Sequence, residues 1–328
     1  MIGGIKVKID SGSARKIGLS AAAVKNLDVI PVGTLFLSVV IGTLNRHEDL
    51  LKTLRYFANE ETYRPFEVIV VDQSDSVDPR LRAFLDRKSD LFRVIRLSER
   101  NLPKARNAGI ELAKGEIIVF VDDDVEILPG FLAGHAAAFA DAGIWGATGP
   151  AFEPGARKLV SAQSLTQKNI DDLNSGRNVM RTDFAYDTAM LYGCNMSIRR
   201  STFERIGHFD EFYEGGYCDD VDISRRIKLS GGRLRYTPAA QLVHYQRQTG
   251  GRRVNPVNSA RYIRDHVRSV VFVDSMHWIS IFRMFRAMIL SRHAYRAGQM
   301  GFYQALAFWQ AVADARREFN RRNKNVTS

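Results

Sequence analysis

The sequence has only two cysteines among its 328 residues, Cys194 and Cys218. Two cysteines cannot supply the several disulfide bridges on which small secreted domains depend, so a reducing compartment is the simpler expectation. No stretch reaches the roughly 18 uncharged apolar residues that a membrane-spanning helix needs. The most apolar late segment, residues 278–290, is interrupted by Arg283 and Arg286. The start of the chain also lacks the long apolar run of a signal peptide, so we expect a cytoplasmic protein.

Acidic residues are in the minority, with 36 Asp and Glu against 47 Lys and Arg and a formal net charge of +11. Much of the excess lies in residues 276–328, which carry nine basic and two acidic residues, so that 9 − 2 = +7. A basic segment that contains aromatic residues can contact nucleic acid or an anionic lipid surface. The alternative is a solvated helical surface without such a partner.

The same late part of the chain predicts a C-terminal amphipathic helical extension. Apolar residues recur there at helical spacing, at Trp278, Ile281, Phe282, Phe285, Met288 and Ile289. Arginines occupy much of the remaining surface. Such helices can lie in the headgroup region at the inner face of the cell membrane, close to a lipid-linked acceptor. Alternatively, their apolar face packs on the main domain or on a second subunit.

From residue 35 onward, apolar runs of the buried-strand type alternate with helical patterns. The runs lie in residues 35–43, 66–72, 92–97 and 117–121, and the helical patterns in residues 50–57, 81–92, 103–115 and 129–143. This alternation predicts an α/β fold with a parallel sheet covered by helices on both faces. The second half is less regular. It predicts strand and loop in 146–155, a strand and a helix in 193–211, a helix in 217–232 and two short strands in 234–246.

Polar residues stand where three of the predicted strands end: Thr43–Asn45, Asp72 and Asp122–Asp124. Ligands of parallel α/β sheets bind at the carboxyl ends of the strands, so these residues are candidates for one site. Neighbouring carboxylates cannot all stay ionised at a low-dielectric edge without a cation. Mg²⁺ or Mn²⁺ would meet this need by bridging carboxylates to a substrate phosphate. Alternation along a strand points Asp122 and Asp124 the same way and Asp123 the other way.

A resemblance to a known family rests on three segments: VVIGTLNR, EVIVVDQSD and LPKARNAGIELAKGEIIVFVDDD. In order and spacing they resemble the nucleotide-binding half of inverting glycosyltransferases with the GT-A fold. More narrowly, they resemble the bacterial family 2 type, which makes polysaccharides and glycolipids. The resemblance covers residues 35–245 and implies a Rossmann-like, mainly parallel sheet flanked by helices. Residues 1–34 would be an N-terminal extension, and residues 246–328 a basic loop and a helical region.

The resemblance also implies roles for residues on the donor side. Thr43, Asn45 and Arg46 would line the nucleoside pocket, and Asp72 would accept a base N–H, which suits uracil or thymine. Arg106 would contact the base or a phosphate, unless it is an ordinary surface arginine of a helix. Asp122 would touch the ribose and Asp124 would hold the metal. Together with Asp123, these are the donor-side candidates.

A second acidic cluster, CDDVDISRRI, resembles the acidic helix start of the family, with Asp219 in place of its glutamate. Asp220 then matches the general base that takes the proton of the acceptor hydroxyl. The alternative is acidic charge that caps the helix N-terminus. His244 is a candidate metal ligand or a structural histidine.

Five further positions belong to the acceptor side or to the segment after His244. Arg252, beside Gly250–Gly251, would close over a pyrophosphate or belong to a disordered basic loop. Gly193 and Asn195 would face the sugar, whereas Arg199 and Asp210 are expected to be structural.

The function predicted is metal-dependent, inverting transfer of one sugar from a UDP- or dTDP-sugar to a hydroxyl of a saccharide or lipid-linked acceptor. The Gln-x-x-Arg-Trp signature of processive synthases is missing. A sugar nucleotidyltransferase would need a Gly-rich, basic phosphate loop, which Gly42 alone does not supply. A nucleic-acid-binding or membrane-tethering module with a degenerate nucleotide-sugar fold would leave the two acidic clusters unexplained, so no nucleic acid partner is expected. The sugar, the metal and the oligomeric state stay open.

Overall fold

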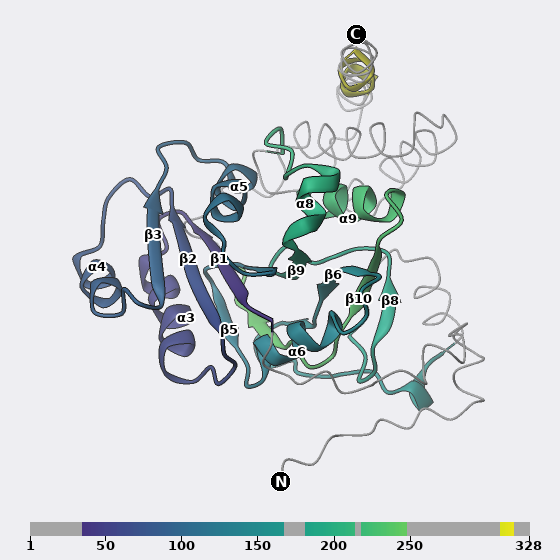
Figure 1. The fold of residues 1–328 in the computed structure, drawn as a ribbon, viewed down its shortest axis with the longest axis horizontal. Helices are drawn as coiled ribbons and strands as arrows, with labels where there is room; N and C mark the ends of the chain where they lie inside the picture. The colour runs from purple at the N-terminus through teal and green to yellow at the C-terminus, as the bar shows by residue number, and fades with distance from the viewer. Residues whose placement is uncertain (1–34, 167–180, 214–217, 248–308, 318–328) are drawn as a thin grey trace, which may run out of the picture.

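The computed structural model describes residues 35–166, 181–213, 218–247 and 309–317 (Figure 1). The first half of the main domain confirms the alternation predicted from the sequence. Its elements are β1 (Leu37–Thr43), α3 (His47–Asn59), β2 (Phe66–Asp72), α4 (Pro79–Asp86), β3 (Phe92–Arg96), α5 (Leu102–Leu112) and β4 (Ile117–Val121). The strands β3, β2, β1 and β4 lie side by side in this order, and each pairing is parallel.

Local chemistry explains where two helices of this half, α4 and α5, begin. Asp78 precedes α4, and its side chain accepts hydrogen bonds from the backbone N–H groups of Arg80 and Leu81. Asn101 does the same for Lys104 at the start of α5. Both helices also carry a proline in their first turn, where no intrahelical N–H bond is lost.

The second half adds shorter elements: β5 (Val125–Ile127), α6 (Phe131–Ala138), β6 (Ile144–Thr148), β7 (Ala151–Phe152), η1 (Ala162–Ser164), β8 (Tyr186–Thr188), β9 (Asn195–Arg199), α8 (Arg200–Ile206), α9 (Asp219–Leu229), β10 (Arg233–Tyr236) and β11 (Leu242–His244). The main sheet has the order β3-β2-β1-β4-β9-β6-β10-β8. Here β9 is antiparallel to β4 and β6, and β8 is antiparallel to β10, so the sheet is mainly rather than wholly parallel, which confirms the mainly parallel sheet that the resemblance implies. A continuous apolar run reports burial on both faces of a sheet, and it carries no information on strand direction.

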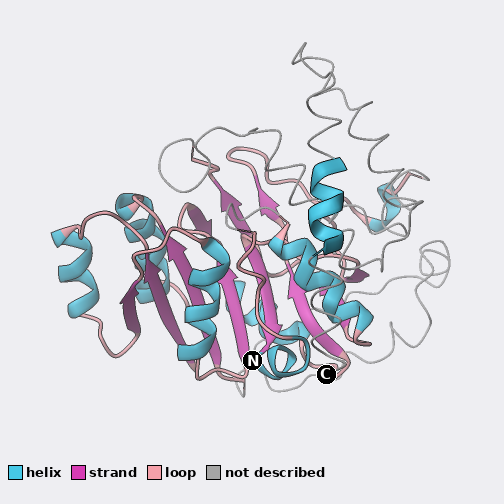
Figure 2. Ribbon diagram, turned by 90° about the horizontal axis from the view of Figure 1, so that it is seen from above, coloured by secondary structure: helices cyan, strands magenta, loops and turns pink. Residues whose placement is uncertain are grey.

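Two hydrophobic layers cover the main sheet. On one face α3 and α6 pack with Leu54 and Phe131 in the same core as Val39 of β1. On the other face α5, α8 and α9 pack around Val40, with Ile223 among the residues buried there. Figure 2 shows the helices on both sides of the strands. The alternating side chains of β1 therefore anchor both layers, and the carboxyl ends of the central strands are held firmly between them.

A second, three-stranded sheet has the order β5-β11-β7. Its strand β5 follows the three-aspartate run almost directly and pairs antiparallel with β11, in a register that sets Val125 opposite His244. The backbone N–H of Tyr245 continues this contact by donating to the carbonyl of Asp124 at 3.0 Å. This small sheet brings His244 to the edge where β4 ends.

Most of the predicted C-terminal extension, and with it Arg252, lies outside the described residues. Within the described part of the extension, residues 309–317, Ala311 and Val312 are buried and Trp309 is exposed. No helix among the described residues is long and apolar enough to cross a membrane.

Candidate active site

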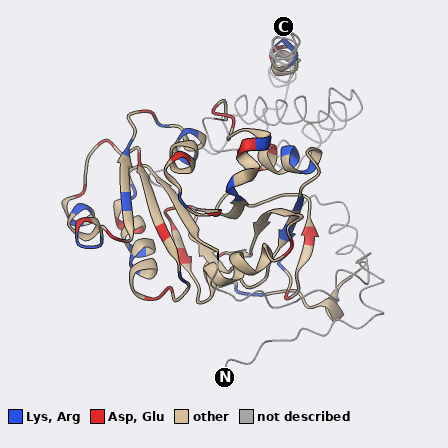
Figure 3. Cartoon of the chain, viewed as in Figure 1, with Lys and Arg blue, Asp and Glu red and all other residues tan. Residues whose placement is uncertain are grey.

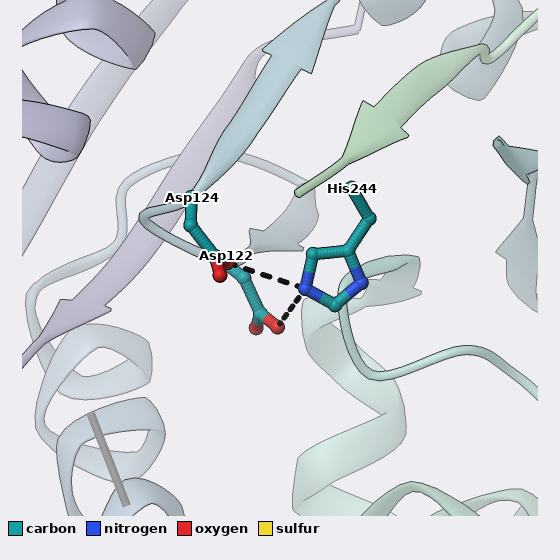
Figure 4. A group of neighbouring side chains, drawn as sticks. All are labelled: Asp122, Asp124 and His244. Atoms are coloured by element: carbon teal, nitrogen blue, oxygen red, sulfur yellow. Dashed lines mark ion pairs between the residues drawn. The ribbon is translucent and has the colours of Figure 1, made fainter. Parts of the chain in front are cut away.

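Asp122, Asp124 and His244 converge at the carboxyl edge of the main sheet (Figure 4). His244 Nε2 lies 3.4 Å from Asp122 Oδ2 and 3.2 Å from Asp124 Oδ1. One atom from each of the three side chains falls within 4.8 Å of the others. Two carboxylates and one imidazole are a donor set that suits a divalent cation.

Asp124 Oδ1 and His244 Nε2 face each other at 3.2 Å as an ion pair, yet neither buried atom makes a well-aligned hydrogen bond to any described residue. Buried polar atoms are rarely left without a partner, and a cation shared between these two would provide one. The residues therefore fit a bound metal ion. This arrangement agrees with the sequence-based pairing of Asp122 with Asp124.

The electrostatics of the cluster show strong mutual stabilisation. Burial alone would lower the pKa of His244, but Asp124, the Cys194 thiol and Asp122 raise it to about 11. Burial alone would raise the pKa of Asp124, and its contacts with His244, the Arg247 N–H and Arg46 lower it to about 2. A metal ion would compete with the imidazole proton here, because metal ligands bind in their deprotonated forms.

Asp123 turns away from this cluster and is held by β1 and the following loop. Thr43 Oγ1 donates to its Oδ2 at 2.7 Å, and Arg46 Nη1 donates to its Oδ1 at 3.1 Å. Burial is the main cause that raises the pKa of Asp123 to about 7. Thr53 of α3 donates to the carbonyl oxygens of Asp123 and Val125, which fixes the backbone of the aspartate run. Thr43 and Asp123 are therefore structural supports of the site. The predicted contact of either residue with the nucleotide-sugar donor stays a prediction.

Asp72, the predicted base-reading acid, ends β2 and is only 4% exposed. Its Oδ1 accepts the backbone N–H of Ser74 at 2.9 Å. Two further cationic or titratable groups lie near it: His47 Nε2 and Arg96 Nε, each 3.8 Å from a carboxylate oxygen. Sequence reasoning missed His47, although it is the first residue of the helix that follows β1. Its position at the start of the helix, shortly after the strand-end motif Thr43–Asn45, was the available signal.

Asn45 lies in the loop between β1 and α3, with a left-handed backbone conformation (φ +56°) that asparagine tolerates well. Its backbone N–H donates to Ser74 Oγ at 2.8 Å, and its side-chain amide donates to Asp75 at 2.9 Å. Asn45 thus joins the two loops that follow β1 and β2. Its predicted contact with the nucleoside stays a prediction.

Arg106 on α5 is 4% exposed and is therefore not a surface arginine. Its guanidinium forms an ion pair with Asp219, the first residue of α9, and donates to the carbonyl of Gly193 at 2.9 Å. It also lies 3.9 Å from Asp122 Oδ1. The base or phosphate contact predicted for Arg106 remains untested, and its described contacts are with the protein.

Asp220, the predicted base, is held by backbone groups. Gly193 N–H donates to Oδ2 at 3.0 Å and Val221 N–H donates to Oδ1 at 2.8 Å. Burial is the main cause that raises its pKa to about 6, and the charge of Asp219 adds to it. Neither aspartate is the cap of α9, because Cys218 holds that position without a side-chain cap bond.

Asn195 does not face the sugar, contrary to the sequence-based expectation. Its side chain is fully buried, where Nδ2 donates to the carbonyl of Ala240 at 2.8 Å and Oδ1 contacts His135 Nε2 at 3.0 Å. Asn195, at the start of β9, makes its hydrogen bonds inside the core. Its partners lie far away in the sequence, so no local pattern could predict them. Arg199 is structural as expected, since it donates to the carbonyls of Ile144 and Phe139.

Comparison with known proteins adds a family to this geometry. Residues 38–207, just over half of the chain, match the family described as Glycosyl transferase family 2. Hyaluronan synthase of Pasteurella multocida is 31% identical over 137 residues, which are 40% of this chain and 13% of the synthase. The N-acetylglucosaminyl-diphospho-decaprenol L-rhamnosyltransferase of Mycobacterium tuberculosis is 32% identical over 88 residues, 26% of this chain and 27% of that one.

Solved structures show the same fold. A mannosyltransferase of Pyrobaculum calidifontis, in complex with GDP-Man and Mn²⁺, aligns with a TM-score of 0.56 and 18% identity over 94% of this chain and 89% of its own. At this level of identity the likeness establishes the fold, which is the GT-A fold. The chain spans only 13% to 27% of the length of the two named relatives.

Proposed function

The chain belongs to glycosyl transferase family 2, and we propose that it transfers one sugar from a UDP- or dTDP-sugar to a hydroxyl group of a saccharide or lipid-linked acceptor. The transfer would depend on a divalent cation, Mn²⁺ or Mg²⁺, and invert the anomeric carbon. The observation that carries the proposal is the position of Arg106. This buried guanidinium contacts Asp122 of the metal cluster on one side and Asp219, next to the candidate base, on the other.

The proposed chemistry needs one base and one stabilised leaving group. The acceptor oxygen attacks the anomeric carbon, its proton passes to a carboxylate oxygen of Asp220, and the bond from that carbon to the diphosphate breaks. The electron pair of this bond leaves with the nucleoside diphosphate. A cation held by Asp122, Asp124 and His244 would supply charge stabilisation to that leaving group.

The protonation state of Asp220 supports its role as base. A pKa of about 6 leaves the carboxylate ionised at neutral pH, yet basic enough to accept a proton in the transition state. The N–H donors of Gly193 and Val221 fix its orientation, so it does not need to reorganise on substrate binding.

The donor base and the acceptor are inferred from chemistry and from relatives. A carboxylate such as Asp72 accepts the imide N–H of uracil or thymine. The mycobacterial relative is named for an acceptor saccharide carried on a diphospho-polyprenol. The tail of this chain, predicted to be amphipathic, would suit an acceptor of that kind at the inner face of the membrane. For the nucleic-acid alternative there is less support, because acidic and basic positions are interspersed over the described elements (Figure 3).

A thermal-shift panel tests the proposal. Nucleotide sugars with each common base are added to the full chain, with and without Mn²⁺. Binding of one donor to the native state raises the unfolding temperature, and we expect this only for a UDP- or dTDP-sugar and only when Mn²⁺ is present. Stabilisation by no nucleotide sugar, together with salt-sensitive binding to DNA, would overturn the proposal.

A further inference from the structure

We propose that Arg46 is a positioning residue of the metal site. Its guanidinium holds Asp124 so that one carboxylate oxygen of Asp124 faces His244 and a cation. This inference rests on the proposed metal dependence and deepens it. It departs from the sequence-based expectation, in which Arg46 lines the nucleoside pocket.

The guanidinium of Arg46 joins three parts of the site. Its Nη1 lies 3.1 Å from Asp123 Oδ1 and 3.2 Å from Asp124 Oδ2, and its Nη2 donates to the carbonyl of Arg247 at 3.0 Å. The side chain is 9% exposed. A planar guanidinium presents several N–H groups at fixed angles, so it can make these contacts together, whereas the single ammonium group of lysine cannot.

The contact with Arg247 ties down the segment that follows β11. Gln246 adopts a left-handed backbone conformation (φ +50°), which is uncommon for a residue with a side chain. This turn directs the backbone N–H of Arg247 at Asp124 Oδ2, at 2.8 Å. The Arg247 side chain also pairs with Asp49 of α3, at 3.2 Å. Residues 245–247 are thus fixed to α3 and to the aspartate run at once.

The consequence is a carboxylate with two different faces. Asp124 Oδ2 receives the Arg247 N–H and the charge of Arg46, and Asp124 Oδ1 points at His244 without a hydrogen-bond partner among the described residues. Outer groups that fix the orientation of a metal-binding side chain typically contribute a factor of about 10 to 100 in metal affinity. Arg46 would contribute in this way, although its positive charge repels a cation.

The charge of Arg46 and its orienting contacts should change metal affinity in opposite directions, which makes the inference testable. If Arg46 acted through charge alone, its removal would strengthen the binding of a cation to the neighbouring carboxylates. If it orients Asp124, its removal weakens that binding. If it contacted the donor directly, its removal would weaken nucleotide binding even when the metal site is saturated.

The experiment is calorimetric titration of the full chain with Mn²⁺, and then with UDP at saturating Mn²⁺. We expect Arg46→Met to raise the Kd for Mn²⁺ by about 10- to 100-fold and to leave the Kd for UDP at saturating Mn²⁺ within about threefold. The Kd of Arg46→Lys for Mn²⁺ should lie between the values of the wild type and Arg46→Met. Equal or tighter Mn²⁺ binding by Arg46→Met would overturn the inference, as would a selective loss of UDP binding at saturating metal.

Two further variants keep the test interpretable. Arg46→Met also removes the positive charge beside the buried Asp123 carboxylate. The double variant Arg46→Met with Asp123→Asn removes both charges and should show the same weaker Mn²⁺ binding. Arg55→Met changes an exposed arginine of α3, the helix that follows Arg46, and this variant should bind Mn²⁺ like the wild type. If the wild type itself bound no Mn²⁺, with or without UDP, the proposed metal dependence would fail. If the wild type bound Mn²⁺ and Arg46→Met bound it with the same Kd, only the positioning role would fail.

Discussion

Arg106 of α5 and Asp219 of α9 form an ion pair that is almost wholly buried between the two helices. A buried pair costs desolvation, and it persists where further contacts satisfy both partners. Here Arg106 also donates to the Gly193 carbonyl, while the N–H of the same glycine donates to Asp220. The pair therefore sets the loop and the helix start that carry the candidate base, and it does so beside Asp122.

Asp220→Asn should abolish sugar transfer and leave donor binding intact. The amide keeps the shape of the side chain but cannot accept the acceptor proton, and such a change typically costs about 100-fold or more in rate. Turnover and the Kd for the donor with Mn²⁺ are measured on the same preparation. Glu204→Gln, at an exposed position of α8, is the control and should behave as wild type. Normal transfer by Asp220→Asn would show that another group is the base.

The rate should depend on pH through the same carboxylate. Because the pKa of Asp220 is raised to about 6, the active ionised form is lost as the pH falls below that value. We expect kcat/KM to fall about tenfold per pH unit below pH 6 and to level off above it. Mn²⁺-dependent UDP binding, followed over the same pH range, separates the base from the metal site. A flat profile between pH 5 and 7 would contradict the assignment.

The first acidic cluster could be predicted in more detail than the second half of the fold. The grouping of Asp122 with Asp124 was predicted from alternation along a strand, and the structure brings the two together although both lie in the short bend between β4 and β5. The direction of β9 and the partners of Asn195 depend on segments far away in the sequence, such as Ala240 and α6. The donor role of Arg46 was implied by the family resemblance and stays a prediction, whereas its contact with Arg247 comes from a distant segment that no local pattern places there.

Asp124 and Asp123 should differ sharply on substitution, although they are neighbours. Asp124→Asn removes a charge from the metal cluster and should lose Mn²⁺-dependent UDP binding. Asp123→Asn changes a side chain that bonds to Thr43 and Arg46, so most of this binding should remain. Titration with UDP at fixed Mn²⁺ measures both variants. An equal loss in the two would mean that Asp123, too, contacts the donor or the metal.

His135 predicts how stability changes in acid. Burial lowers its pKa to about 3, against about 6.5 in an unfolded chain. Between these two pH values the unfolded chain binds a proton that the native state excludes. The contribution of His135 to the free energy of unfolding is therefore fully present above pH 6.5 and is lost as the pH decreases. The expected loss from this group between pH 6.5 and 5 is about 2 kcal/mol. His135→Gln removes the titrating group, and its free energy of unfolding in urea should fall less over this range; an unchanged slope would contradict the prediction.

Gly149 lies against the segment that leads into β11, and a side chain there should disturb the metal site from a distance. A Cβ atom at this position would lie 1.9 Å from the carbonyl oxygen of Ala240, a backbone atom that cannot turn aside. Gly149→Ala should therefore lower the free energy of unfolding by about 3 kcal/mol, as strained core substitutions do. Because β11 carries His244, the folded fraction should also bind Mn²⁺ more weakly.

Gly143→Ala is the matched control for this prediction, because the added Cβ would mainly meet the flexible end of Arg233, at 2.9 Å. It should cost less than about 1 kcal/mol, since a surface side chain can move away. Urea unfolding and Mn²⁺ titration of both variants give the comparison. If Gly149→Ala were as stable as Gly143→Ala, the close approach of Ala240 would be incorrect; if it were unstable but bound Mn²⁺ normally, β11 would not depend on this contact for the position of His244.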